Sequence, residues 1–233
     1  MRLLLLTVTV VLGVLLASRL GAAHGEPHTA PPTTVAKPPA VRHHPRRAPQ
    51  LPLHVTVIGD SVADEIAYVD SAQHLLARGV RLQLELAACR RLVEPSCTVA
   101  GVQPTTTLDL IRTLGATLGP VVVVSVGYND DAFLYSRDVG AILSALHHAG
   151  VRRVLWLTLR AERHTYLAMN GVRRSAAARD AALTVVDWNR YSRSHPTWFD
   201  DDGLHLTPSG ADAMARLLHH TFARLRLTTA RPD

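Results

Sequence analysis

Apolar runs and amphipathic stretches alternate along the chain from Leu53 onward. The apolar runs predict five buried strands, at 53–59, 81–88, 121–127, 151–159 and 183–188. The stretches between them place apolar residues at helical spacing and predict helices, over 61–78, 105–119, 139–150, 171–182 and from 208 onward, with a polar loop at 161–170. The run at 121–127 is apolar on both faces, as a covered central strand of a parallel sheet requires. This alternation predicts one α/β domain over 53–228, with a flavodoxin-like, doubly wound sheet of five parallel strands and helices on both faces.

The N-terminal residues have the pattern of an export signal. A positive Met1-Arg2 precedes an apolar segment at 3–17, and Gly21-Ala22-Ala23 offers small residues for cleavage after Ala23. The pattern predicts export, with 1–23 as a signal peptide or as an uncleaved signal-anchor that holds the protein at the membrane through residues 3–23. Residues 24–52 carry eight prolines among 29 positions and predict a disordered linker.

The net charge of +6 comes mostly from the N-terminal part of the chain. Residues 1–52 hold six of the 25 Lys and Arg and one of the 19 acidic residues, so the remainder is nearly balanced. A nucleic-acid-binding domain concentrates basic residues on its folded part. We therefore expect no nucleic-acid partner. A monomer is a separate expectation.

Polar side chains follow the carboxyl ends of several predicted strands. Ser61 comes after the first strand, Asn129 comes after the third, and Asp202 and His205 come after the fifth. In a parallel sheet such residues meet at one edge, where ligands bind. A serine hydroxyl becomes a good nucleophile when an imidazole takes its proton and a carboxylate orients that imidazole. The pattern predicts acyl-transfer chemistry with Ser61 as nucleophile, His205 as base and Asp202 as its orienting acid.

An acyl-transfer site also needs donors for the negative charge that develops on the carbonyl oxygen. The candidates are the side-chain amide of Asn129 and backbone N–H groups at Ser61 and near Cys89. Three neighbouring side chains are candidates for contact with a substrate: Arg90, Tyr128 and Asp130. The alternative for Arg90 is an ordinary surface charge.

Each of these residues also has a purely structural interpretation. Ser61 could cap a helix, Asn129 and Asp130 could be turn residues, and Asp202 and His205 could belong to a solvated loop. Agreement in chain order and in position at strand ends favours catalysis over these separate alternatives. The two cysteines, Cys89 and Cys97, lie close together and predict a disulfide in an exported protein.

Three segments resemble the sequence blocks of the SGNH (GDSL-type) hydrolases: VIGDS at 57–61, VGYND at 126–130 and DDGLHLTPSG at 201–210. The resemblance covers roughly 53–226 and implies Ser61 as nucleophile, Asn129 as oxyanion donor and an Asp202–His205 pair. It implies no cofactor and no metal. In ELAACRRL at 85–92, Cys89 matches a position where the family has glycine, by similarity to SGNH domains linked to membrane O-acyltransferases; Gly101 is the alternative.

These observations predict an exported serine esterase that acts on a small-molecule or glycan acyl ester, with O-acetyl groups on envelope glycans as one substrate class. Two alternatives stay open. The first is an O-acyltransferase that moves the acyl group to a sugar hydroxyl. The second is a non-catalytic envelope-binding module, which predicts a degraded triad.

Overall fold

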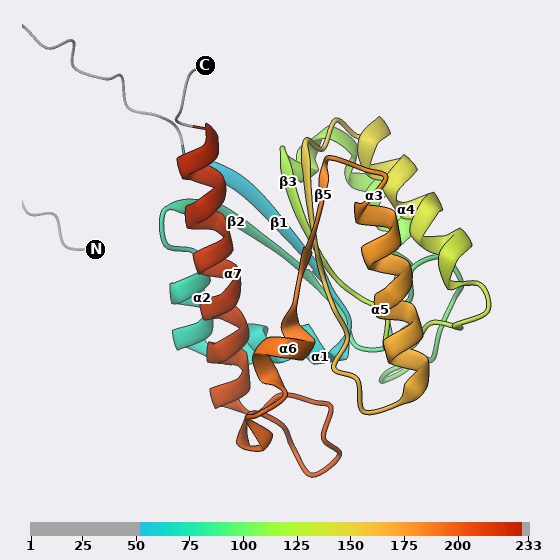
Figure 1. Cartoon of the computed structure of the whole chain (residues 1–233), viewed down its shortest axis with the longest axis vertical. Coiled ribbons are helices and arrows are strands. Elements are labelled where there is room, and N and C mark those ends of the chain that lie inside the picture. The colour runs from blue at the N-terminus through green and yellow to red at the C-terminus, as the bar shows by residue number, and fades with distance from the viewer. Residues whose placement is uncertain (1–51, 230–233) are drawn as a thin grey trace, which may run out of the picture. The chain divides into compact units, whose positions relative to one another are not determined.

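A sheet of five parallel strands runs through the described part of the chain (Figure 1). The computed structural model describes residues 52–229, and the side chains up to residue 225. The strand order is β2-β1-β3-β4-β5, which confirms the flavodoxin-like prediction. The strands are β1 (Leu53–Gly59), β2 (Val80–Leu86), β3 (Val121–Ser125), β4 (Arg153–Leu157) and β5 (Leu183–Val186). In this order β1 lies between β2 and β3, and the ends of β1 and β3 meet where Gly59 pairs with Ser125.

Helices cover both faces of the sheet, as predicted. Figure 1 shows α2 and α7 over one face and α3, α4 and α5 over the other, with α1 and α6 at the carboxyl ends of the strands. The α-helices are α1 (Ser61–Asp64), α2 (Asp70–Leu76), α3 (Thr107–Leu114), α4 (Tyr135–His148), α5 (His164–Ala177), α6 (Trp188–Ser192) and α7 (Pro208–Thr229). Three short 3₁₀ helices complete the set: η1 (Glu65–Tyr68), η2 (Gly115–Leu118) and η3 (Pro196–Trp198).

Successive side chains of the central strands enter two separate cores. In β3, Val121 and Val123 face the core under α7, whereas Val122 and Val124 face the core under α4. Burial on both faces explains why β3 is an unbroken valine run rather than an alternating pattern.

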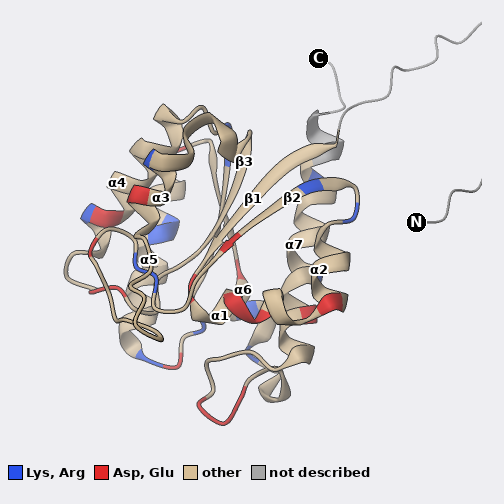
Figure 2. Ribbon diagram, turned by 180° about the vertical axis from the view of Figure 1, so that it is seen from behind, with Lys and Arg blue, Asp and Glu red and all other residues tan. Residues whose placement is uncertain are grey.

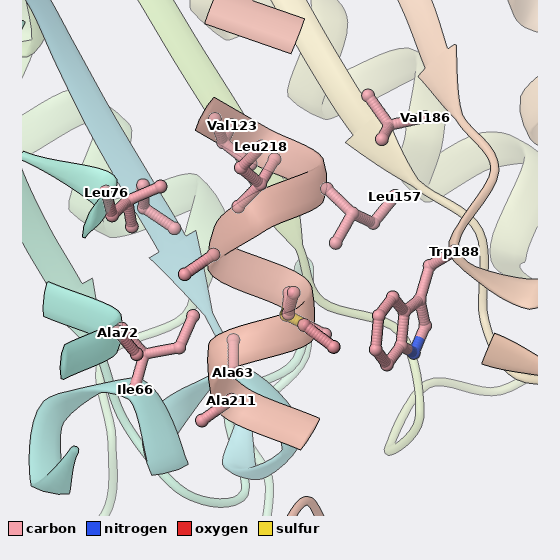
Figure 3. Close-up of a cluster of buried hydrophobic side chains, with 14 of the residues drawn as sticks. Ala63, Ile66, Ala72, Leu76, Val123, Leu157, Val186, Trp188, Ala211 and Leu218 are labelled. Carbon is pink, nitrogen blue, oxygen red and sulfur yellow. The ribbon is translucent and has the colours of Figure 1, made fainter. Parts of the chain in front are cut away.

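The last helix packs through the stripe that the sequence predicts. Ala211, Met214, Leu218 and Phe222 are all buried. Figure 3 shows Leu218 of α7 near Val123 and Leu157 of the sheet, with Ile66 and Leu76 on the other side of the helix. The helix begins as expected, because Pro208 is its first residue and the Thr207 hydroxyl accepts a hydrogen bond from the Gly210 N–H (3.3 Å).

The predicted continuous helix over 61–78 is wrong. The chain is extended at Val69, which separates η1 from α2. The side-chain amide of Gln73 donates to the Ala67 carbonyl (2.8 Å), a carbonyl near the end of η1 that a continuous helix would bond to a backbone N–H. Both Ile66 and Leu76 reach the same core through this bend.

The predicted polar loop at 161–170 is also wrong over most of its length. Helix α5 begins at His164, and Tyr166, Met169 and Arg173 on it are buried. Their spacing of three and four residues is helical, but the polar and charged residues among them conceal the pattern. The prediction of a surface helix from Gly171 therefore fails at its start and in its degree of burial.

Charged residues of both signs are interspersed over the described ribbon (Figure 2). Between residues 52 and 229 no helix combines the length and the apolarity that crossing a bilayer demands. The predicted signal at 1–23 and the predicted linker, apart from Pro52, lie outside the described residues.

Candidate active site

Ser61 stands at a tight junction between a strand and a helix. Strand β1 ends at Gly59 and α1 begins at Ser61. A Cβ atom at Gly59 would lie 2.6 Å from the Ala63 Cβ and 2.7 Å from a Leu86 methyl group, so only glycine fits this turn. The residue that caps α1 is Asp60, whose carboxylate accepts from the Val62 N–H (3.2 Å). The interpretation of Ser61 as the helix cap is therefore wrong, and its hydroxyl is left for another partner.

Asp202 and His205 are held in one short loop before α7. Phe199 and Leu206 bridge the base of this loop, and the Asp200 N–H donates to the His205 carbonyl (2.9 Å). Gly203 has a φ of 69°, which lets the chain reverse between the two site residues. The spacing of three residues thus brings an acid and an imidazole to the same side of the loop.

The structure brings Ser61, His205 and Asp202 into a hydrogen-bonded series. His205 Nε2 lies 3.0 Å from the Ser61 Oγ, and His205 Nδ1 lies 2.5 Å from the Asp202 Oδ2. The other Asp202 oxygen accepts from the N–H groups of Leu204 and His205 (2.8 and 2.9 Å). The side-chain bond from His205 and these N–H donors lower the pKa of Asp202 to about 2. An ionised Asp202 can hold the proton on Nδ1 and leave Nε2 free to take the serine proton.

The predicted oxyanion donors are two backbone N–H groups and one side-chain amide. The N–H groups of Ser61 and Cys89 donate no hydrogen bond to another described residue. Cys89 has a φ of 62° and follows Ala88 in a turn closed by the Arg90 N–H and the Ala87 carbonyl (3.3 Å). Such a left-handed conformation favours glycine, so the cysteine adopts the backbone that a glycine would provide there. Gly101, the alternative, has a φ of 80° in a separate turn.

The cysteine loop, residues 89–97, is bonded to the β3 loop, which follows β3 and carries Asn129. The predicted disulfide between Cys89 and Cys97 is present. The Leu92 N–H donates to the Asp130 carboxylate (2.9 Å), and the Asn129 Nδ2 donates to the Arg90 carbonyl (3.4 Å). Asn129 is exposed and keeps a second amide hydrogen for another acceptor.

Solved structures with a similar architecture include esterases and an acyltransferase. A carbohydrate acetylesterase family member from Sinorhizobium meliloti is 15% identical, with a TM-score of 0.57 over 74% of this chain and 98% of that one. The esterase EstA from Pseudoalteromonas sp. is 13% identical, with a TM-score of 0.55 over 75% of this chain and 98% of that one. The chain has the SGNH hydrolase fold. No protein-family model matches the sequence.

Among curated proteins, the chain is similar to one from Bacillus subtilis named "Putative peptidoglycan O-acetyltransferase YrhL". The two are 24% identical over 152 residues, which are 64% of this chain. The match spans only 24% of the length of YrhL, about a quarter of that protein.

The polar groups of the three predicted substrate-contacting side chains are instead bonded to the protein's own backbone. Arg90 is buried, and its guanidinium donates to the carbonyls of Gly59, Glu85 and Thr105, so it is neither a surface charge nor available to a substrate. The Tyr128 hydroxyl accepts from the Arg160 N–H (2.7 Å), and the Tyr128 ring packs edge-on against Tyr166.

The third of these predictions, Asp130, fails for the same reason. Its side chain is fully buried and accepts from the Leu92 N–H beside the Arg91 guanidinium. Burial raises the pKa of Asp130 to about 6, although that N–H and the charge on Arg91 oppose the rise. Asp130 therefore fastens the cysteine loop to the β3 loop and does not face a ligand.

Sequence reasoning missed the role of Asp60. This fully buried carboxylate accepts from the N–H groups of Val62, Gly127 and Tyr128 (3.2, 3.0 and 3.2 Å). Burial raises the pKa of Asp60 to about 6, and the three N–H donors oppose that rise. Asp60 thus fixes the turn before Ser61 to the segment before Asn129. A charged residue directly after a strand that ends in Val57-Ile58-Gly59 is the signal that could have revealed it.

The residues that the structure describes contain no cluster of three or more His, Cys, Asp or Glu side chains placed to hold a metal ion.

Proposed function

We propose that the protein is a serine esterase of the SGNH type, with Ser61, His205 and Asp202 as its catalytic triad. The observation that carries this proposal is the 3.0 Å contact between the Ser61 Oγ and the His205 Nε2. The two residues that supply these atoms are 144 positions apart in the sequence, one at the start of α1 and the other in the loop before α7. A proton can pass directly from the hydroxyl to the ring across such a distance.

The proposed reaction has two acyl-transfer steps. The Ser61 Oγ attacks the ester carbonyl while His205 Nε2 takes the serine proton, and collapse of the tetrahedral intermediate releases the alcohol, which receives that proton. The acyl group is then an ester on Ser61. Water attacks this ester in the same way, loses a proton to His205, and the acid leaves as the Ser61 hydroxyl is restored. The ionised Asp202 orients His205 throughout.

Three N–H donors are proposed to stabilise the oxyanion: the backbone groups of Ser61 and Cys89 and the side-chain amide of Asn129. The two backbone groups have no other acceptor among the described residues. Asn129 is exposed, and only one of its two amide hydrogens is needed for its bond to the Arg90 carbonyl. One such donor typically contributes ~3–4 kcal/mol to lowering the barrier.

Acetyl esters on envelope glycans are the proposed substrate class. A carbohydrate acetylesterase family member shares the fold, and the similar B. subtilis protein is named for peptidoglycan O-acetylation. The apolar segment at 3–17 and the small residues at 21–23 support export, with either release or anchoring at the membrane.

The test uses the full-length chain. We expect it to release p-nitrophenol from p-nitrophenyl acetate and acetate from an O-acetylated glycan, and Ser61→Ala to abolish both activities. Ser71→Ala is the matched control, because the Ser71 hydroxyl contacts Asp212 on α7 and not the triad. Equal rates for wild type and Ser61→Ala would overturn the proposal and leave the non-catalytic binding module as the better interpretation.

Transfer of the acyl group to a sugar hydroxyl is the second candidate, and the name of YrhL favours it. Exposure of the triad favours hydrolysis instead, because the side chains of Asp202 and His205 are 48% and 44% exposed and water can reach them. A sugar acceptor added with p-nitrophenyl acetate separates the two. p-Nitrophenol is released in both cases. Free acetate as the sole acetyl product supports the esterase, and an acetylated sugar supports the transferase.

A further inference from the structure

Arg173 on α5 is a charged side chain with no exposed surface. In the described part of the chain no carboxylate lies within ion-pair distance of its guanidinium, and its Nε has no hydrogen-bond partner. Removing an arginine from water without a paired acid is costly. The triad chemistry does not use this residue, so its burial needs another explanation.

The guanidinium lies directly behind the loop that follows β3. Its Nη2 donates to the Val126 carbonyl (2.9 Å), and its Nη1 donates to the Asn170 Oδ1 (2.8 Å). Asn170 in turn bonds both the N–H and the carbonyl of Leu159 (2.7 Å each), which fixes it to the chain after β4. The arginine therefore has a rigid support on one side and the β3 loop on the other.

Gly127 makes this approach possible. A Cβ atom there would lie 2.3 Å from the Arg173 Nη2 and 3.1 Å from the Tyr135 hydroxyl. Gly127 also has a φ of 153°, at the edge of the region that side chains avoid. The glycine before Tyr128 and Asn129 is thus explained by contact with a buried arginine.

The same loop is held from its other side by Asp60. The Asp60 carboxylate accepts from the N–H groups of Gly127 and Tyr128, while Arg173 bonds the carbonyl of Val126. Three consecutive residues are therefore fixed between an anion and a cation, and Asn129 follows immediately. The charge on Arg173 also favours the ionised form of Asp60, which is the form that accepts these bonds best.

We propose that Arg173 is a positioning residue for ester cleavage: by fixing the Val126–Tyr128 segment, it holds the Asn129 amide where the oxyanion forms. This inference rests on the proposed function. A displacement of about 1 Å in a catalytic group can lower a rate ~100-fold. Loss of the guanidinium should therefore lower the rate of the chemical step, although Arg173 touches no reacting atom.

A double-mutant cycle tests the proposal on the full-length chain. The variants are Arg173→Met, Asn129→Ala and the double variant, with kcat and KM measured on p-nitrophenyl acetate and the midpoint of thermal unfolding measured in parallel. We expect Arg173→Met to lower kcat ~10- to 100-fold and to change KM less than ~3-fold. In the Asn129→Ala background the same substitution should lower kcat less than ~3-fold, because the group it positions is already gone.

Two further variants complete the design. Arg174→Met is the matched control, since Arg174 is the next residue on α5, is half exposed and pairs with Asp187; its kcat should not change. Arg173→Lys keeps the charge and one donor for the Val126 carbonyl, so we expect it to recover part of the kcat. If Arg173→Met does not fold, Arg173→Lys takes its place in the cycle, and the same loss of effect in the Asn129→Ala background is expected.

Equal kcat losses with and without Asn129, or an unchanged kcat in a folded Arg173→Met variant, would overturn the positioning role. Failure of the proposed function gives a different result. In that case the wild-type chain itself hydrolyses no ester and Ser61 is not labelled by a fluorophosphonate, and the inference about Arg173 falls with it.

Discussion

The Asp60 Oδ2 lies 3.0 Å from the backbone nitrogen of Gly127, 67 residues further along the chain. This bond crosses from the end of β1 to the end of β3, the two strands between which the strand order reverses. Ligands bind at such switch points in doubly wound sheets. The residue before the proposed nucleophile therefore also holds the segment before the proposed oxyanion donor.

Asp60→Asn should disturb both segments at once. An amide cannot accept three N–H bonds without turning its own NH₂ group toward one of them, so a buried donor loses its partner at a cost of about 1 to 3 kcal/mol. We expect a lower unfolding midpoint and a kcat reduced ~10- to 100-fold. Asp201→Asn is the control, because Asp201 is exposed and makes no side-chain hydrogen bond or ion pair within the described part of the chain. A kcat for Asp60→Asn equal to that of the control would contradict this role.

Asp202→Asn should separate activity from stability. The asparagine oxygen can still accept from the Leu204 and His205 N–H groups, so the loop keeps its shape. Its NH₂ group, however, would face His205 Nδ1 and favour the tautomer that carries its proton on Nε2. We expect kcat to fall ~10³- to 10⁴-fold, as for other triads, with the unfolding midpoint nearly unchanged. Comparable activity in this variant and the wild type would argue against the triad.

The sequence was sufficient to predict a doubly wound sheet of five parallel strands. Long apolar runs identify the five strands, and alternation with helices leaves few right-handed arrangements. Helix boundaries were harder. The break at Val69 is accompanied by a local side-chain bond from Gln73 to the Ala67 carbonyl, which the apolar spacing does not reveal. The start of α5 is concealed by polar residues on its buried face.

Only part of the candidate site could be predicted, because the residue type does not show which way a side chain points. A polar residue after a strand can face a ligand or can turn inward to bond backbone groups, and the residue type does not distinguish the two. Ser61, Asp202 and His205 were placed together correctly. Arg90, Tyr128 and Asp130 turned inward, and the buried roles of Asp60 and Arg173 were not foreseen.

The backbone of Cys89 gives a prediction about the disulfide. In Cys89→Gly/Cys97→Ser and Cys89→Ala/Cys97→Ser the cross-link is lost equally, but only glycine adopts a φ near 62° without strain. Holding alanine in this region costs about 1 to 2 kcal/mol. We expect the glycine variant to have a kcat ~10-fold higher than the alanine variant on p-nitrophenyl acetate. Equal kcat values would mean that the left-handed conformation of residue 89 has no part in catalysis.

The buried carboxyl of Asp130 should make stability depend on pH. Its pKa is raised from 3.8 to about 6 by burial, and its Oδ2 has no partner among the described residues. A carboxyl that holds its proton more tightly in the folded chain stabilises fully below about pH 4, and this contribution is lost as the pH rises through about 6. Asp130→Asn does not titrate, and its amide oxygen can still accept from the Leu92 N–H.

We therefore expect the free energy of unfolding of Asp130→Asn, relative to wild type, to increase by about 2 to 3 kcal/mol between pH 4 and pH 7.5. Urea denaturation of both proteins at the two pH values measures this difference. A difference that does not vary with pH would contradict the raised pKa.

The central claim is that the Ser61 hydroxyl is activated by His205. Labelling of the full-length chain with a fluorophosphonate, followed by peptide mass spectrometry, tests this claim most directly. We predict a single adduct on Ser61, no adduct in Ser61→Ala and labelling at least ~100-fold slower in His205→Ala. An adduct on another residue, or equally fast labelling without His205, would contradict it.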